Sequence, residues 1–323
     1  MTTTTWPAVR VRVPRLSASA IWAGMRRQKL LTIALGILAV MIFLAAVGPI
    51  IAPHDPESVL RETLLDEQGQ PILNSQGDPR TQLVNLRAPS GTYWFGTDEK
   101  ALDVFSRTIS APRVDLVIAI ASTIIGLGAG SVIGLVAGYA AGRGRLVGSL
   151  AEVLTRFMDI IQAFPVFIVA LALVAVIGSG QDKVIYVLSF LFTPIFFRYV
   201  RAETLLVREL TFVEAERAVG NPTRRIMFNH ILPNSVTTAT VQGSAVMGYA
   251  ILLTAGLSFV GAGVAPPTPE WGAMIRSGVE LMQSGQWWTS VFPGITLGLT
   301  VFSLAVIGES IRVRWRGSGL RGY

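Results

Sequence analysis

The chain has 323 residues, of which 51% are hydrophobic and only 15% are charged, and its mean hydropathy is +0.54. Soluble domains carry about 25% charged residues, so this composition excludes an ordinary soluble domain, and it also excludes a disordered chain. The sequence holds no cysteine and 2 histidines, His54 and His230. Disulfides, a thiolate nucleophile and cysteine-based metal sites are therefore excluded, and a histidine-rich metal site is not expected.

Six apolar runs are long enough to cross a membrane. A bilayer core about 30 Å thick takes roughly 20 mostly apolar residues per helix, and backbone in lipid must form helices or a closed barrel. The runs are too long for strands, so we expect an all-α membrane protein with six transmembrane helices. We place these helices at Leu30–Ala52, Val114–Ala141, Leu150–Ile177, Lys183–Val200, Ser235–Ala262 and Thr289–Ile311.

The basic residues indicate the orientation of these helices. The net charge is +7 and the pI is about 10.2, and most arginines lie in segments that share a side with the N-terminus if the chain crosses six times. Because arginine and lysine favour the cytoplasmic side, we expect both termini in the cytoplasm. No basic cluster interleaves with aromatic residues on a soluble domain, so nucleic-acid binding is not expected.

This topology predicts the organisation of the chain. The first apolar run is longer than the core of a secretory signal peptide, so we interpret it as a retained helix. The expected parts are a cytoplasmic basic arm (1–29), the first transmembrane helix (30–52), an external segment (53–112), a core with five transmembrane helices (113–315) that includes a cytoplasmic loop (205–234), and a cytoplasmic tail (316–323).

The external segment is polar and rich in turns, as in Gln76-Gly77-Asp78-Pro79. Two short stretches, Gln70–Leu73 and Thr81–Leu86, have the composition of strands and predict a hairpin or small cap. A plain solvated loop is the alternative.

Glycines recur every fourth residue in the second predicted helix, which places them near one face where another helix can approach closely. Prolines in the third and fourth helices, Pro165 and Pro194, are expected to kink or unwind them. The glycines of this stripe are Gly126, Gly130, Gly134, Gly138 and Gly142.

The sequence lacks the patterns of an enzyme. A Walker A loop needs a lysine after a glycine, and none of the lysines, at positions 29, 100 and 183, follows one. The sequence also has no Gly-x-Ser-x-Gly elbow and no His-Glu-x-x-His motif. Acidic residues in the third and sixth spans lie near the cytoplasmic ends, where arginines can pair with them. We therefore expect a chain without catalytic residues, metal or bound cofactor.

The cytoplasmic loop between the fourth and fifth spans predicts two short amphipathic helices. Thr211 followed by Glu214 has the spacing of a capping box, and Phe212, Ala215 and Val219 would share one face of the first helix. Gly220 would end that helix with a positive φ. Asn221-Pro222 would begin the second helix, so the loop has the form of a docking element.

The same loop resembles the motif Glu-Ala-Ala, three residues, Gly, nine residues, Ile-x-Leu-Pro of integral membrane subunits of ABC importers. Here Glu216 stands in place of the second alanine, and His230 stands in place of the first isoleucine. The chain is also similar to C-type permeases of the oligopeptide, dipeptide and nickel branch. The supporting stretches are Tyr93–Asp98, Asp103–Arg107, Leu257–Val264, Pro266–Gly272, Trp287-Trp288 and Phe292-Pro293-Gly294.

The resemblance implies a type I importer fold in a bacterial inner membrane. It implies a second homologous permease subunit, two ABC ATPase subunits that hold ATP and magnesium, and an external substrate-binding protein near the external segment and Pro266–Trp271. Peptides are the expected cargo, with nickel, an opine, a glycan or another solute as alternatives and an ion-driven carrier as a remote one. The implied ATPase-docking residues are Phe212, Glu214, Ala215, Glu216, Ala218, Gly220, Asn221, Pro222, His230, Leu232 and Pro233.

Overall fold

Five helices are each long and apolar enough to cross a membrane in the computed structural model, which describes residues 29–319. Most of the predicted basic arm and the last four residues of the tail lie outside this range. The predicted all-helical membrane fold is confirmed. The five helices are α2 (Lys29–Ile51), α3 (Val104–Ala140), α6 (Gln181–Val207), α9 (Leu232–Phe259) with the helical turns before it, and α11 (Trp288–Gly319).

The third predicted span is broken. It consists of α4 (Arg145–Ala163) and α5 (Val166–Ile177), which meet at 94°, so a single helix over 150–177 is wrong. The cause is Pro165, because proline lacks an N–H and forces the residue before it into an extended conformation. Phe164 accordingly has φ −92° and ψ 148°. In contrast, Pro194 lies inside α6 without ending it.

Two helix boundaries outside the predicted spans matter for the site. Helix α3 begins at Val104, ten residues before the predicted span, because the Asp103 side chain accepts the Ser106 N–H as an N-cap. The external segment therefore ends near residue 103 rather than 112. A further helix, α10 (Trp271–Leu281), which is followed by the short turn η2 (Met282–Ser284), joins α9 to α11 and was not predicted.

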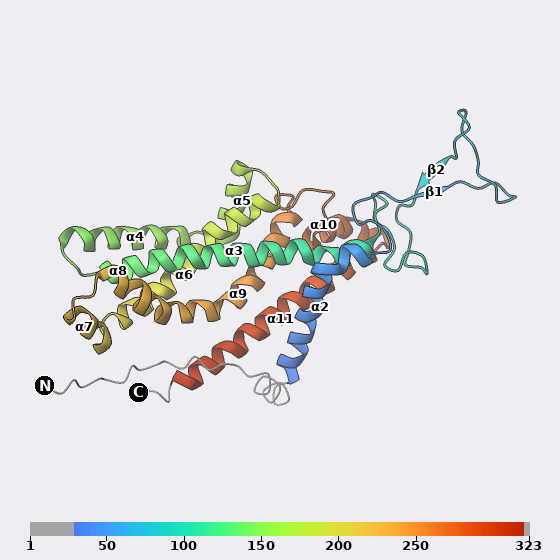
Figure 1. Ribbon diagram of the computed structural model, residues 1–323. Helices are drawn as coiled ribbons and strands as arrows, with labels where there is room; N and C mark the ends of the chain where they lie inside the picture. The colour runs from blue at the N-terminus through green and yellow to red at the C-terminus, as the bar shows by residue number, and fades with distance from the viewer. Residues whose placement is uncertain (1–28, 320–323) are drawn as a thin grey trace.

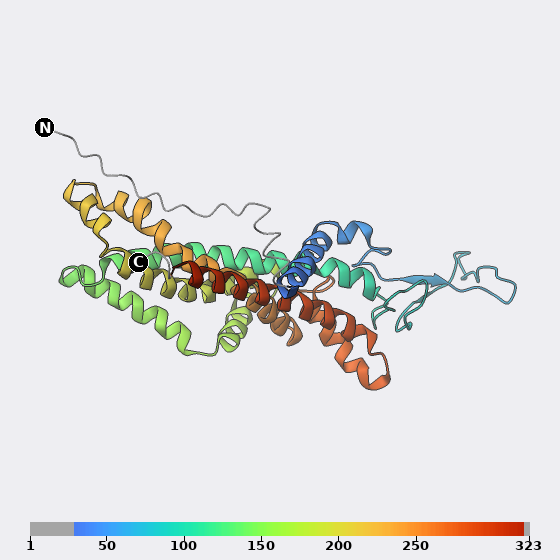
Figure 2. The same cartoon turned by 90° about the horizontal axis from the view of Figure 1, so that it is seen from below.

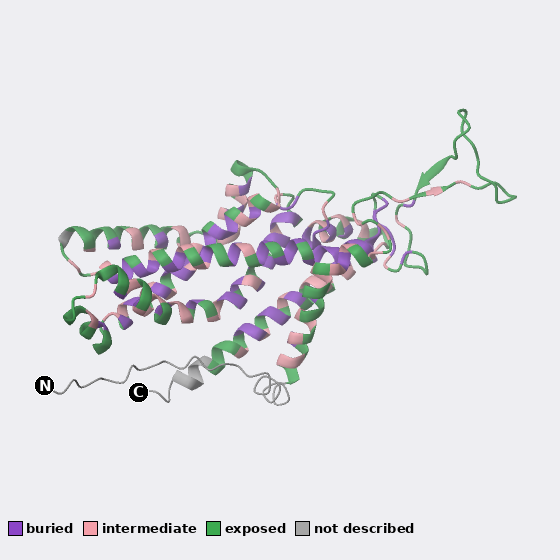
Figure 3. Cartoon of the chain, viewed as in Figure 1, coloured by how far each residue is buried: buried purple, intermediate pink, exposed green. Residues whose placement is uncertain are grey.

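The glycine stripe of α3 packs directly on α6. A Cβ at Gly130 would lie 2.6 Å from the Thr193 carbonyl oxygen, and a Cβ at Gly134 would lie 2.7 Å from the Phe197 carbonyl oxygen. Cβ atoms at Gly126 and Gly138 would lie 2.8–2.9 Å from side-chain carbons of α6. These approaches make α3 and α6 the buried centre of the bundle (Figure 3).

Gly142 is the exception in the stripe. It follows the end of α3, has φ +73°, and no other atom of the described chain lies within 4 Å of its Cβ position. The prediction that Gly142 packs against a helix is therefore wrong, because α3 ends at Ala140 before the four-residue spacing reaches it.

An arm projects from one end of the bundle (Figures 1 and 2). Strands β1 (Arg61–Thr63) and β2 (Thr81–Leu83) pair antiparallel within it. The stretch Gln70–Leu73, predicted as a strand, makes only isolated bridges, Leu65 to Pro71 and Leu73 to Pro79. Prolines at these positions cannot donate to a ladder, so the hairpin is shorter than expected.

The arm and the predicted docking loop lie at opposite ends of the bundle (Figure 1). Helices α7 (Thr211–Ala218) and α8 (Thr223–Arg225) of the loop lie near the C-terminal end of α3, whereas the arm leads into the N-terminal end of α3. Helix α2 packs on α3 and α11, and α9 packs on α3, α6 and α11. The long helices α3 and α9 thus connect the two ends.

Candidate functional site

The predicted docking loop forms two helical parts joined by a sharp elbow. The first is α7 (Thr211–Ala218), and the second begins with α8 (Thr223–Arg225) and the π-helical turn η1 (Ile226–Ile231). Gly220 has φ +83°, which confirms the predicted positive φ. The Asn221 N–H donates to the Glu216 carbonyl and the Gly220 N–H to the Arg217 carbonyl, which is the Schellman pattern of a helix end.

The start of α7 differs from the prediction. Leu210 is the N-cap and Thr211 is already helical, so the Thr211 side chain caps nothing in the described structure. The first amide groups are instead satisfied by the backbone, since the Val213 and Glu214 N–H groups donate to the Leu210 carbonyl.

One face of α7 carries exposed apolar side chains. Phe212 is 39% exposed and Val219 is 82% exposed, with Ala215 exposed between them. The opposite face holds Val213, which is completely buried. Because large apolar groups at such exposure leave apolar area in water, they indicate a surface that a partner covers.

The rest of the predicted docking set surrounds this face. Glu214, Ala218, Pro222 and Pro233 are exposed, whereas Glu216, Asn221, His230 and Leu232 are half-buried. The structure therefore brings all eleven predicted residues into one continuous stretch from α7 to the first turn of α9, with the half-buried polar members turned toward the elbow.

The docking element is fixed to the bundle through the C-terminal end of α3. Nη1 of Arg208 donates to the carbonyls of Gly138 at 2.8 Å and Ala141 at 2.6 Å. These carbonyls lack helical partners at the end of α3, and a cation there also complements the helix dipole. The Arg143 guanidinium lies 3.8 Å from the centre of the Tyr139 ring.

The second helical part is continuous with a membrane-spanning helix. Residues Thr223–Phe259 form one apolar helical run that includes α8, η1 and α9. The expectation of two separate short helices is therefore wrong for the second one. Ile226 and Ile231 are buried and attach the run to the bundle, so its end near α7 and its membrane part form one rod.

The other end of this rod lies beside a buried polar junction, which is a group of hydrogen bonds between α3 and the start of α10. The Trp271 N–H, at the start of α10, donates to Oδ2 of Asp115 at 3.3 Å, and the Trp271 ring Nε1 donates to the Thr108 carbonyl at 3.2 Å. Oε1 of Glu270 accepts the Gly272 N–H at 2.8 Å and caps α10. Asp115 lies inside α3 and is fully buried.

A pocket of about 410 Å³ opens beside this junction. Charged side chains of both signs line it, from the external segment and from α10: Glu99, Lys100, Arg276 and Glu280. The loop after α9 forms its wall, including Pro266. The rod of α9 therefore ends at a polar, solvent-accessible surface on the side opposite the docking element.

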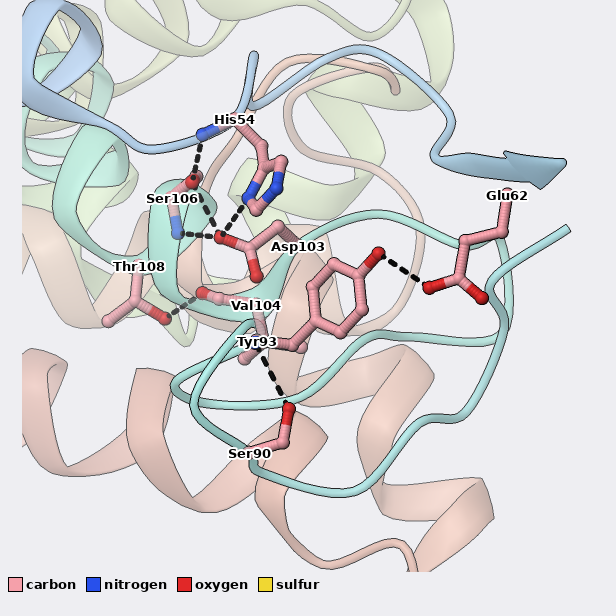
Figure 4. Close-up of polar contacts among 8 residues, drawn as sticks. All are labelled: His54, Glu62, Ser90, Tyr93, Asp103, Val104, Ser106 and Thr108. Atoms are coloured by element: carbon pink, nitrogen blue, oxygen red, sulfur yellow. Dashed lines mark hydrogen bonds and ion pairs between the residues drawn. The ribbon is translucent and has the colours of Figure 1, made fainter. Parts of the chain in front are cut away.

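A histidine, an aspartate and a serine meet where α2 leads into α3, but not as a catalytic triad (Figure 4). The Ser106 hydroxyl donates to Oδ2 of Asp103 at 2.5 Å, and Nδ1 of His54 lies 3.7 Å from the same oxygen. The serine thus faces the carboxylate and not the imidazole, so no nucleophile and base are paired. Beside them the Tyr93 hydroxyl donates to Glu62, and burial followed by this bond raises the pKa of Tyr93.

The described residues offer no alternative site for a metal. Among residues 29–319, no group of three or more histidine, aspartate or glutamate side chains is placed to hold a metal ion. The main surface feature near α7 is its exposed apolar face, which lies beside a helical run that continues into the bundle.

Comparisons with known proteins agree with this arrangement. Residues 130–315 match the family model described as binding-protein-dependent transport system inner membrane component, and residues 18–75 match the N-terminal transmembrane domain of oligopeptide transport permease C. The chain is 31% identical to the glutathione transport system permease protein of Pectobacterium atrosepticum over 95% of this chain and 93% of that protein. It is 37% identical to the dipeptide transport system permease protein of Alkalihalophilus pseudofirmus over 75% and 78%.

A solved structure shares the fold. The inward-facing MetNI methionine ABC transporter aligns with a TM-score of 0.51 at 18% identity, covering 65% of this chain and 95% of that chain. The residue range that matches the family model contains the C-terminal part of α3 with Gly130, Gly134 and Gly138, and all of α6, the docking element and α9. The chain belongs to the family of inner membrane components of binding-protein-dependent transport systems, and within it to the C-type permeases of the oligopeptide and dipeptide branch.

Proposed function

We propose that this chain forms half of the translocation path of an ATP-driven importer and transmits the movement of a cytoplasmic ATPase to that path. A second homologous permease would supply the other half, two ABC ATPase subunits would bind ATP and magnesium, and an external binding protein would deliver the substrate. Both termini would lie in the cytoplasm. The observation that carries the proposal is the exposed apolar face of α7 at the end of the rod Thr223–Phe259.

The rod gives the proposal its mechanism. ATP binding would close the two ATPases and draw the docking elements of the two permeases together. Because α8, η1 and α9 are one helical run, displacement of the cytoplasmic end tilts α9 and reaches the loop before α10. Coupling requires different contacts at both ends in the two states, and the rod connects the docking face with the polar pocket near Pro266.

Peptides are the proposed cargo. The support is the names of the relatives, which are dipeptide and glutathione transport permeases. Nickel, an opine, a glycan or another solute remains the alternative. Loss of uptake of a labelled dipeptide in a strain lacking this chain, with restoration by the wild-type chain, would support peptides. Normal dipeptide uptake with loss of uptake of another solute would favour that solute.

The experiment for the importer itself is purification of the tagged chain from its native host in mild detergent. We expect a second six-span permease and Walker-motif ATPases in stoichiometric amounts, identified by mass spectrometry. An ion-driven secondary transporter would purify without an ATPase, and its uptake would follow an ion gradient without ATP. That result would overturn the proposal.

A further inference from the structure

The elbow of the docking element is bridged by a set of polar side chains. Oε1 of Glu216, in the last turn of α7, lies 3.7 Å from Nε2 of His230 in η1, which is within ion-pair range when the imidazole is protonated. The Asn221 side-chain amide donates to the other carboxylate oxygen of Glu216. We call Glu216, Asn221 and His230 the elbow clasp, because they join the two sides of the bend.

The clasp is built into the structure and is not a loose surface contact. The Glu216 side chain is 28% exposed and the His230 side chain 33% exposed, so both are substantially removed from water. The backbone is also fixed on both sides: the Asn221 N–H donates to the Glu216 carbonyl, and the Asn234 side chain donates to the His230 carbonyl at 2.6 Å. A partly buried charge that is held by several partners orders its surroundings more than an exposed pair does.

Glu216 and His230 are also the two departures from the importer motif. Glu216 stands where that motif has alanine, and His230 stands where it has isoleucine. In this structure the two positions face each other across the elbow. Both departures therefore lie in one polar contact of this chain, in which Glu216 also accepts from Asn221.

We propose that the elbow clasp makes α7 and the rod Thr223–Phe259 move as one body, so that Glu216 and His230 are positioning residues for energy coupling. The proposal rests on the proposed function. Force applied to the exposed face of α7 can reach α9 only if the bend at Gly220 does not absorb it. No other atom of the described chain lies within 4 Å of the Gly220 Cβ position, so packing around this glycine does not brace the bend, and the clasp supplies a side-chain contact across it.

The test is a double-mutant cycle in the complete importer, reconstituted with its binding protein. The variants are Glu216→Ala, His230→Ile and the pair Glu216→Ala/His230→Ile. The matched control is Glu209→Ala, which removes a neighbouring exposed glutamate whose ion pair is with the adjacent Arg208. Two quantities are measured: substrate transported per ATP hydrolysed, and hydrogen exchange of the amides of residues 211–219.

Each single variant should lower transport per ATP about fivefold and speed exchange in α7 by a similar factor, because one half-buried partner is left alone. The double variant should recover most of the wild-type transport per ATP and most of the slow exchange in α7. The reason is that alanine and isoleucine place an apolar contact across the elbow. The control should resemble the wild type. Retention of the ATPase in all purified complexes shows that docking itself is intact.

Three results would overturn the proposal that the clasp couples α7 to the rod. The single variants could leave both exchange and transport per ATP unchanged, or they could speed exchange without changing transport per ATP. The third result is a double variant as impaired as the sum of the two single variants. Failure of the proposed function looks different. In that case the wild-type chain would show no ATP-driven transport, while the exchange measurements would still report whether the clasp holds α7.

Discussion

Gly220 is the residue whose backbone conformation bears most directly on the proposed coupling. Its φ of +83° is costly for a residue with a branched Cβ, by about 1–2 kcal/mol. We predict that Gly220→Val leaves the chain in the membrane but lowers binding-protein-stimulated ATP hydrolysis by the assembled importer about tenfold, whereas Gly220→Asn retains most of it because asparagine tolerates positive φ.

The control for this prediction is Gly36→Val. Gly36 lies in α2 with ordinary helical backbone, and no other atom of the described chain lies within 4 Å of its Cβ position. Equal losses in Gly36→Val and Gly220→Val would mean that added bulk, and not the positive φ, causes the defect.

Asp115 supports a second prediction at the residue scale. Its Oδ2 accepts the buried Trp271 N–H, which otherwise has no partner at the start of α10 within the described structure. Asp115→Asn keeps an acceptor oxygen there, whereas Asp115→Leu leaves the donor unsatisfied at a cost of about 1–3 kcal/mol. We expect thermal unfolding in detergent to be nearly unchanged for Asp115→Asn and lowered by several degrees for Asp115→Leu. Equal midpoints for the two variants would contradict this role.

At the scale of elements, the α3–α6 pair depends on the absence of side chains along one stripe. A Cβ at Gly130 would lie 2.6 Å from the Thr193 carbonyl oxygen, whereas no other atom of the described chain lies within 4 Å of the Cβ position of Gly128 on the same helix. Gly130→Val should therefore destabilise the bundle by about 1–3 kcal/mol, and Gly128→Val should not. Fluorescence-detected gel filtration after heating measures the difference, and equal melting would show that the two helices do not need this close approach.

Some local features of the helices could be predicted from the sequence, and others could not. The four-residue glycine spacing and the Gly220 elbow were predictable, because packing and positive φ each require glycine at a fixed position. A kink or an unwound segment at Pro165 was predicted, but its angle of 94° was not, since the angle depends on how the neighbouring helices pack. Helix α10 was missed, because its cap is a glutamate, which is not among the usual N-cap residues, and because the burial of Trp271 depends on contacts with α3.

At the scale of the whole molecule, the lengths of the apolar runs predicted the bundle, and the resemblance of the loop motif and other stretches predicted its family. These features did not concern the path of the chain between the loop and the membrane. They did not predict the continuity of the docking element with α9. That continuity arises because the helical turns at Thr223–Ile231 carry buried Ile226 and Ile231, which the sequence alone does not separate from the exposed Phe228. Nor could sequence place Glu216 opposite His230, since their contact depends on the angle of the elbow.

The central claim is that the exposed face of α7 lies on an ATP-hydrolysing subunit, and a single cysteine tests it most directly. The natural chain has no cysteine, so Val219→Cys places one reactive thiol at an 82% exposed position. Ser75→Cys, in the exposed external arm, is the control. Membranes are treated with a short cysteine-to-amine cross-linker. Our account predicts an adduct between residue 219 and a Walker-motif ATPase that is absent for residue 75. Efficient labelling at residue 219 without any ATPase adduct would contradict it.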